Sequence, residues 1–218
     1  MSFPRGNLLI DTTPEMRLQL LRERVRLIHA IAYTHAHADH LFGLDDARLF
    51  PKHIGGPVPI YCEEATERDI RRVFQYAFQE QTAQLPAGYL PKIFFERITP
   101  GVPFEVLGQS VLPIRLEHGP FAVLGFRVGD LAYCTDVSKI PDASWPLLEG
   151  LDTLILDALR YKPHPTHFNL AEALEVVERL KPRSTYFTHL SHDFDHGPTV
   201  TTLPPRVALS YDGLALEF

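Results

Sequence analysis

A short run near the start of the chain combines three imidazoles with a carboxylate. It follows the apolar segment 30–33 and reads Thr34-His35-Ala36-His37-Ala38-Asp39-His40. Nitrogen and oxygen donors grouped this closely suit divalent ions such as zinc, manganese or iron. If segment 30–33 is a strand, side-chain alternation places His35 and His37 on one face. A turn after them would bring Asp39 and His40 nearby, so the run predicts a metal site. The alternative is a solvated, histidine-rich loop.

Three more candidate ligands follow β-rich stretches later in the chain. His118 comes at the end of the apolar run 111–116 and before a Gly-Pro turn. Asp136 ends the stretch 131–135, and His189 ends the stretch 184–188. Open α/β folds place their sites where strands end. Each residue taken singly could be an ordinary polar group at a strand end, but their order after the first run favours metal ligands.

The pattern His-x-His-x-Asp-His at residues 35–40 resembles the signature of the metallo-β-lactamase fold. The later His, Asp and His occur in that family's order, and the resemblance covers nearly the whole chain. It implies an α/β fold, the αββα four-layer sandwich, with two mixed β-sheets and helices outside, as one domain over residues 1–218. It also implies two divalent ions, zinc or manganese with iron as another option. One ion would be held by His35, His37 and His118, the other by Asp39, His40 and His189, with Asp136 bridging both.

Such a pair of ions would share a hydroxide and bring its pKa towards neutrality. The two positive charges favour a substrate whose negative charge grows during attack. Each ligating imidazole needs an acceptor for its other N–H group. Asp11, Asp157 and nearby backbone carbonyls are candidates for this role, although either aspartate could instead be a plain strand-end cap.

The kind of ligand points to a branch of the family. Antibiotic-hydrolysing members place a cysteine where this chain has Asp136, and we expect the nearby Cys134 to be a small core residue. Several motifs are similar to those of the branch named for phosphoribosyl 1,2-cyclic phosphate phosphodiesterase. They are residues 10–14, 34–40, 43–46, 118–120, 135–136 and 188–192. The resemblance implies a metal-dependent hydrolase that cleaves a small cyclic phosphate or phosphodiester.

That branch also carries a histidine that is not a ligand, shortly before the final metal histidine. His167 matches this position and would protonate the leaving oxygen of the substrate. With Asp39, it completes the expected catalytic pair. A helix-capping role is the alternative for His167, and His164 is its rival as proton donor. Residues 160–162 (Arg-Tyr-Lys) either contact phosphate or simply solvate their loop.

Composition and charge narrow the cellular context. The chain has 218 residues and a net charge of −6, so it lacks the basic surface expected for nucleic acid or an anionic membrane. No apolar stretch approaches the length of a membrane span, and no signal peptide is evident. Two cysteines cannot form a disulfide framework, which favours a reducing compartment. We expect a cytoplasmic protein with a small anionic phosphate ester as its partner and a homodimer as one assembly to test.

Periodicity and punctuation predict the elements that position these residues. Strands are expected at 7–10, 30–33, 58–62, 111–116, 131–135, 153–156, 185–187 and 214–218. Helices are expected at 12–24, 63–79 and 170–180, the first with a capping box from Thr12 to Glu15. Gly129-Asp130 is a predicted hairpin turn, and residues 82–92 are a predicted connection.

One departure from the branch pattern leaves other functions open. Members begin with an extra strand and a glycine-rich turn, and here only six residues precede Asn7, so we expect that strand to be missing. A tRNA 3′-end-type nuclease would need a basic arm, and a glyoxalase II-like thioesterase would need a C-terminal helical extension; neither is visible. The non-enzyme alternative is a truncated homologue that binds metal but is catalytically silent.

Overall fold

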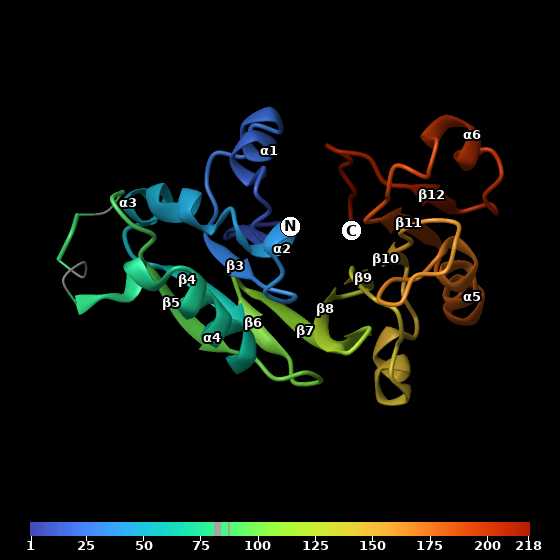
Figure 1. The fold of residues 1–218 in the computed structure, drawn as a ribbon, viewed down its shortest axis with the longest axis horizontal. Helices are drawn as coiled ribbons and strands as arrows, with labels where there is room; N and C mark the ends of the chain where they lie inside the picture. The colour runs from blue at the N-terminus through green and yellow to red at the C-terminus, as the bar shows by residue number, and fades with distance from the viewer. Residues whose placement is uncertain (81–83, 87) are drawn as a thin grey trace. The chain divides into compact units, whose positions relative to one another are not determined.

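The computed structural model describes residues 1–80, 84–86 and 88–218. The chain forms two compact units (Figure 1). The first comprises Met1–Thr99 and Phe104–Ser110, and the second comprises Pro100–Pro103 and Val111–Phe218. Each unit has its own buried apolar core. One domain over residues 1–218 stays a prediction.

The first unit contains a five-stranded sheet in the order β1-β2-β3-β4-β5. Its strands are β1 (Ser2–Phe3), β2 (Gly6–Ile10), β3 (Ala30–Ala32), β4 (Val58–Cys62) and β5 (Ile93–Arg97). β1 is antiparallel to β2, whereas β2 to β5 are parallel. Ile31, Val58 and Ile60 are fully buried in the core of this unit, as expected for parallel strands with apolar sequences.

Short helices connect these strands. They are α1 (Met16–Arg22), α2 (Ala38–Leu41), α3 (Phe50–Ile54) and α4 (Glu64–Val73), with 3₁₀ helices at Leu44–Leu49 and Gln75–Phe78. The capping box predicted for the first helix is wrong. Glu15 is the N-cap of α1 and has no side-chain cap, because the Thr12 hydroxyl donates a hydrogen bond to the Leu41 carbonyl instead.

A seven-stranded sheet has the order β12-β11-β10-β9-β8-β7-β6. Its strands are β6 (Phe104–Val106), β7 (Gln109–His118), β8 (Phe121–Val128), β9 (Leu131–Cys134), β10 (Thr153–Asp157), β11 (Ser184–Thr188) and β12 (Val207–Leu209). Strands β9 to β12 are parallel, and β7, β8 and β9 are antiparallel neighbours. Both sheets are therefore mixed, as predicted.

The helices of the second unit are α5 (Leu170–Leu180) and α6 (His196–Val200), with a 3₁₀ helix at Asp142–Leu148. α5 has the bounds predicted for it. Its apolar residues Ala173 and Val176 are buried in the core of the unit. No described helix is long and apolar enough to cross a bilayer.

Three expectations about elements need correction. Residues 214–218 do not form the final strand, which is β12, because Val207 and Leu209 are the residues buried in the core. The helix predicted over 63–79 ends at Val73 and continues as a 3₁₀ turn. A short strand, β1, does precede β2, and Gly6 at φ +140° allows the turn between them. Residues 82, 83 and 87 of the predicted connection lie outside the described residues.

Candidate metal-binding clusters

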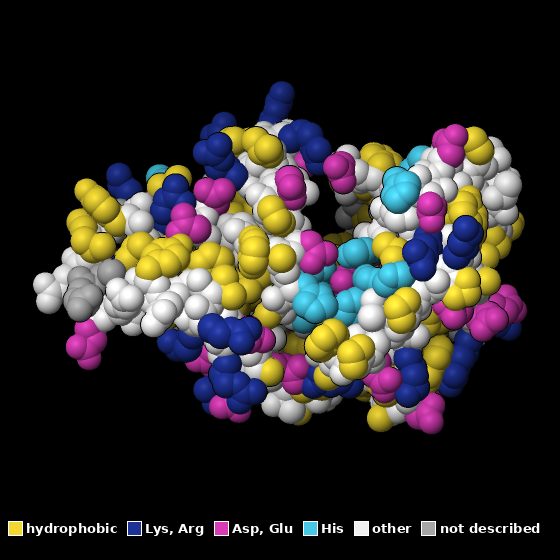
Figure 2. All heavy atoms as spheres, viewed as in Figure 1, with side chains coloured by type: hydrophobic (Ala, Val, Ile, Leu, Met, Phe, Trp, Pro, Cys, Tyr) yellow, Lys and Arg dark blue, Asp and Glu magenta, His cyan; other side chains and the backbone are white. Residues whose placement is uncertain are grey.

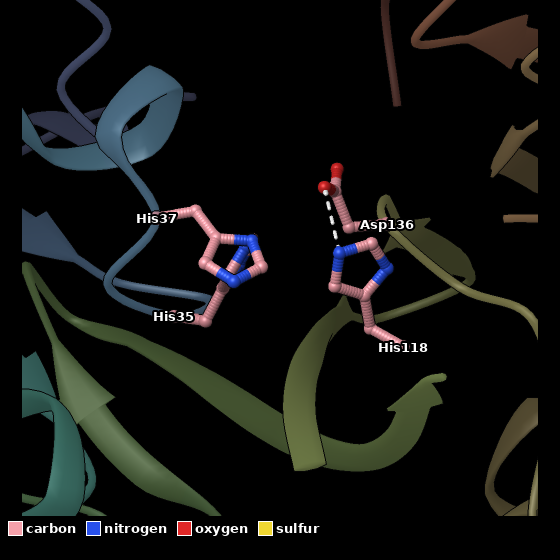
Figure 3. A group of neighbouring side chains, drawn as sticks. All are labelled: His35, His37, His118 and Asp136. Atoms are coloured by element: carbon pink, nitrogen blue, oxygen red, sulfur yellow. Dashed lines mark ion pairs between the residues drawn. The ribbon is translucent and has the colours of Figure 1, made fainter. Parts of the chain in front are cut away.

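The first cluster, defined as His35, His37, Asp39 and His40, lies entirely in the first unit. β3 ends at Ala32, one residue before the end of the strand predicted at 30–33, and the two leading histidines occupy the loop that follows it. α2 then begins at Ala38 and brings His40 back. The ring centroid of His35 lies 4.4 Å from the ring centroid of His37 and 4.2 Å from that of His40. Figure 3 shows the rings of His35 and His37 next to each other. A loop and a helical turn therefore gather the imidazoles.

Asp11 holds this cluster from the end of β2. Its Oδ2 accepts a hydrogen bond from His40 Nδ1 at 2.7 Å and another from the Thr34 hydroxyl at 2.8 Å. Its Oδ1 accepts from the Thr34 backbone N–H at 2.8 Å. Burial raises the pKa of the Asp11 carboxyl, and the bonds from His40 and Thr34 offset part of that effect. The predicted partnership between Asp11 and a cluster imidazole is confirmed.

Thr12 ties the same loop to α2. Its hydroxyl bonds the Tyr33 hydroxyl at 2.7 Å and the Leu41 carbonyl at 3.0 Å, and its backbone N–H donates to the His40 carbonyl at 2.7 Å. Gly43 packs against this loop, where a Cβ atom would lie 2.1 Å from the Thr13 carbonyl oxygen. The sequence motifs at 10–14 and 43–46 thus hold the loop of the first cluster in place through hydrogen bonds and close packing. The sequence alone did not predict this role.

The second cluster, defined as His118, Asp136 and His189, lies entirely in the second unit. His118 ends β7 and donates from Nδ1 to the Thr166 carbonyl oxygen at 2.6 Å. Its Nε2 lies 3.8 Å from Asp136 Oδ2, the ion pair drawn in Figure 3. The other oxygen, Asp136 Oδ1, lies 3.2 Å from His189 Nε2. The structure therefore brings all three residues predicted from strand ends together, around one carboxylate.

Three residues of these surroundings have a left-handed backbone. Asp11, Asp136 and His189 have φ values of 60°, 52° and 58°, and each follows the end of a strand by one or two positions. A non-glycine residue in this conformation costs about 1–3 kcal/mol, and such strain concentrates at functional sites. The turn after β2 directs Asp11 towards the first cluster, and the turns after β9 and β11 bring Asp136 and His189 together in the second. In each case the left-handed backbone lowers the stability of the fold.

His167 pairs with Asp157 beside the second cluster. Its Nδ1 donates to Asp157 Oδ2 at 2.7 Å, and that oxygen also accepts from the Val137 N–H at 2.9 Å. Burial raises the pKa of the Asp157 carboxyl, and the bond from His167 lowers it in part. The His167 ring stacks on His189 with centroids 4.8 Å apart. Asp157 therefore hydrogen-bonds His167, and its carboxylate also lies within 4.8 Å of a ring nitrogen of the predicted ligand His189.

The structure bears on two alternatives for His167: a helix-capping role, and His164 as the proton donor in its place. Asn169 is the N-cap of α5 and forms a complete capping box with Glu172, so His167 is not the cap. His164 lies beside it, with ring centroids 5.1 Å apart, and its Nδ1 accepts from the Thr166 N–H at 3.3 Å. Burial, followed by the neighbouring His167, lowers the pKa of His164. His164 therefore lies next to His167, the residue expected to donate the proton.

The other residues singled out from the sequence have structural contacts. Arg160 donates to the carbonyls of Lys162 and Pro163 in its own loop, and the Tyr161 hydroxyl bonds Thr199 Oγ1 at 2.7 Å. Cys134 is fully buried, and burial raises its pKa to about 12, which confirms it as a core residue. Arg160 and Tyr161 stabilise the loop that carries His167.

The donor set of both clusters fits divalent transition metals. All the ligand atoms are imidazole nitrogens or carboxylate oxygens, the donors that such ions take in proteins. In His40 and His118 an acceptor holds Nδ1–H, so Nε2 is the nitrogen that would bind an ion. Two imidazoles on different units thus carry the same arrangement, with Asp11 and the Thr166 carbonyl as their acceptors.

Comparison with known proteins places this architecture in a family. The model described as Beta-lactamase superfamily domain matches residues 6–190. A crystal structure of a new diphosphatase from the PhnP family is 46% identical with a TM-score of 0.87, and the match covers 97% of this chain and 79% of that one. The short form of human tRNase Z is 19% identical with a TM-score of 0.70, covering 100% and 90% respectively, which shows the fold alone.

A curated relative is longer than this chain. The octanoyltransferase of Porphyromonas gingivalis (strain ATCC BAA-308 / W83) is 31% identical over 209 residues, which make up 95% of this chain and 41% of that protein. The chain thus spans about two fifths of the relative's length. The two mixed sheets with helices confirm the expected metallo-β-lactamase fold class. The chain therefore belongs to the β-lactamase superfamily and, within it, to the PhnP family of metallo-β-lactamase-fold proteins.

Proposed function

We propose that the chain is a metal-dependent phosphodiesterase that cleaves a small cyclic phosphate or a related small phosphodiester. The observation that carries the proposal is the pair formed by Asp157 and His167 beside the second cluster. It supplies an oriented imidazole that is separate from the predicted ligands. The family and its PhnP-type relative support hydrolysis, and the pair supports a substrate with a leaving group that needs a proton.

The metal assignment is part of the proposal. One divalent ion would be held by His35, His37 and His118, a second by Asp39, His40 and His189, and Asp136 would reach both. Zinc and manganese suit these donors, and iron is a third option. Such ions, when bound, lower the pKa of water and stabilise the negative charge that develops on a phosphate ester. Asp39 belongs both to this ligand set and to the expected catalytic pair.

The chain's own residues supply orientation and a proton. Asp11 and the Thr166 carbonyl hold the rings of His40 and His118 in fixed tautomers. Asp157 does the same for His167, so that Nε2 faces away from the carboxylate. A water molecule attacks phosphorus and loses a proton to solvent, so that a new P–O bond forms as the ester P–O bond breaks. His167 in its imidazolium form gives its Nε2 proton to the departing alkoxide oxygen and later regains one from solvent, while the Asp157 carboxylate keeps the Nδ1–H group in place. Hydrolysis then releases a phosphate monoester.

Hydrolysis of a diphosphate is a second candidate. The 46% identical PhnP-family structure is described as a diphosphatase, and it covers nearly the whole of this chain. The two reactions place different demands on His167. A diphosphate releases phosphate, which departs more readily than a sugar alkoxide and gains less from a proton donor.

The remaining candidates are less well supported. The likeness to human tRNase Z rests on 19% identity, and the chain has a net charge of −6 and no basic arm for RNA. Thioesterase activity of the glyoxalase II type has no supporting feature among the described residues. Octanoyl transfer is named for a protein of which this chain matches 41%. A metal-binding but silent homologue stays open to the same assay.

The test is a substrate screen on metal-loaded and metal-stripped protein. Its substrates are a ribose cyclic phosphate, bis-p-nitrophenyl phosphate, a nucleoside diphosphate and S-lactoylglutathione, each with added Mn²⁺ or Zn²⁺. The proposal expects metal-dependent turnover, with the cyclic phosphate depending most on His167. Preference for the diphosphate would favour the second candidate, and turnover of the thioester alone would refute both. No turnover with any substrate would support the silent homologue.

A further inference from the structure

A pocket of about 600 Å³ opens beside α1 in the first unit. We call it the α1 pocket. Its apolar lining consists of Met16, Leu20, Leu21, Val25, Leu49 and Phe50. None of these residues belongs to the first cluster or contributes to its hydrogen bonds. The volume lies within the range of about 300–1,000 Å³ that is typical of small-molecule pockets.

The fold leaves this apolar lining open. α1 is only seven residues long, and the chain leaves it through Arg24 in a left-handed conformation with φ 56°. Met16 and Phe50 form a buried floor, whereas Leu21 and Leu49 keep 68% and 55% of their surface exposed. Leucines exposed together at the mouth of a pocket indicate a surface that binds an apolar group.

The rim of the pocket is positively charged. Arg17, Arg24 and Arg26 are exposed, and within the described part of the chain they take part in no ion pair. His53 adds a fourth basic group to the lining. The acidic Asp46 also lines the pocket, and its Oδ1 pairs with Arg48 Nη1 at 3.4 Å. Figure 2 shows hydrophobic side chains flanked by Lys and Arg over α1. A cationic rim on a chain of net charge −6 favours a ligand with an anionic end.

We propose that the α1 pocket binds a single-chain anionic amphiphile, namely a medium-length fatty acyl chain with a carboxylate head. The chain would lie on Leu20, Leu21 and Phe50, and the head would be held by the arginines at the rim. Arginine binds carboxylates through paired N–H groups, which suits this head group. The proposal is independent of the phosphodiesterase function.

A second copy of the chain is the main competing occupant. A two-fold interface would place the same surface of both copies face to face. Three arginines from each copy would then meet, and the acidic residue of the lining, Asp46, already pairs with Arg48, which opposes association. A fatty carboxylate instead satisfies both the apolar floor and the basic rim.

Isothermal titration of the full chain with straight-chain carboxylates from butyrate to dodecanoate tests the proposal. Each added CH₂ is expected to tighten binding by about fourfold until the pocket is full, at a stoichiometry of one. The neutral alcohol of the same length should bind at least about fivefold more weakly than the carboxylate. No binding, or equal binding of alcohol and carboxylate, would overturn the proposal.

Matched variants locate the binding. Leu21→Asp should weaken binding of decanoate at least tenfold, whereas Leu18→Asp should not, because Leu18 is 62% exposed on the same helix and lies outside the pocket. Arg17→Ala should weaken it and Arg22→Ala should not. Equal effects within either pair would contradict the proposal. So would a dimer in sedimentation that Leu21→Asp dissociates, because the surface would then be an interface between copies.

Discussion

His167 Nδ1 and Asp157 Oδ2 lie 2.7 Å apart, in a pair that is almost completely buried. The pair joins the loop before α5 to the end of β10, and it fixes which nitrogen of the imidazole faces away from the carboxylate. An oriented imidazole beside three candidate metal ligands is the arrangement that a general acid requires.

His167→Ala should leave the metal content unchanged and lower kcat on a cyclic phosphate by about 10²–10⁴-fold, the usual contribution of a positioned proton donor. The loss should shrink on bis-p-nitrophenyl phosphate, because p-nitrophenolate departs without a proton. Steady-state kinetics on both substrates, with elemental analysis, measure this. His164→Ala is the matched control and should cost less than tenfold. Equal losses on the two substrates would assign His167 to binding or folding.

Asp157→Asn should lower kcat by about 10–100-fold with little change in KM, because it removes the charge that orients His167 while preserving side-chain size. Asp152→Asn is the control, since that carboxylate pairs with exposed Arg183 at 2.8 Å. Kinetics on a cyclic phosphate decide the outcome. Unchanged kcat in Asp157→Asn would mean that the pair has no part in turnover.

Asp11→Asn should weaken metal binding by about 10–100-fold, because His40 loses the carboxylate that holds its tautomer. Competition with a chromogenic chelator measures the affinity. Asp45→Asn serves as control, because its carboxylate bonds Arg48 and Tyr76 and contacts no cluster residue in the first unit. Equal affinity of wild type and Asp11→Asn would contradict the supporting role of Asp11.

Glu67 predicts how acid affects stability. Burial alone would raise the pKa of its carboxyl, but hydrogen bonds from Arg97 and Arg71 outweigh burial and lower it below 4.5. A lowered folded-state pKa stabilises the fold above pH 4.5, and this contribution is lost as the pH falls through the folded-state value. Glu67→Gln should therefore destabilise the chain by about 1 kcal/mol at pH 7, with the difference shrinking as the pH falls through the lowered pKa of Glu67.

Urea titrations of wild type and variant at several pH values test the sign. Glu64→Gln is the control, because among the described residues its exposed carboxylate pairs with Arg97 alone. A stability difference that grows as the pH falls would show that Glu67 is not stabilised in its ionised form.

The sequence predicted which residues gather in the two clusters, because the information that identifies them is local. Residue types and spacings within a few positions identify the run at 34–40. The same holds for the apolar stretches that end just before His118, Asp136 and His189. α5 was predicted at its observed bounds from periodicity, and the structure shows that Asn169 caps its N-terminus. Features that depend on neighbouring residues in the sequence are therefore the ones that the sequence predicts correctly.

Other features depend on tertiary contacts that no local pattern encodes. Thr12 and Glu15 have the spacing of a capping box, yet the Thr12 hydroxyl bonds the Leu41 carbonyl, far along the chain. Residues 214–218 have the alternation of a strand, but Val207 and Leu209 fill the edge of the sheet. The sequence could not decide whether Asp157 supports an imidazole or caps a strand end, because strand-end carboxylates look alike until their neighbours are known.

The central claim is metal-dependent phosphodiester hydrolysis by a binuclear site that includes Asp136. The most direct measurement is metal content by elemental analysis together with cyclic-phosphate turnover, on wild type and Asp136→Ala purified without chelator. We predict up to two transition-metal ions per chain with turnover in wild type, and loss of the second ion and of turnover in the variant. Full metal content and full turnover in Asp136→Ala would contradict the account.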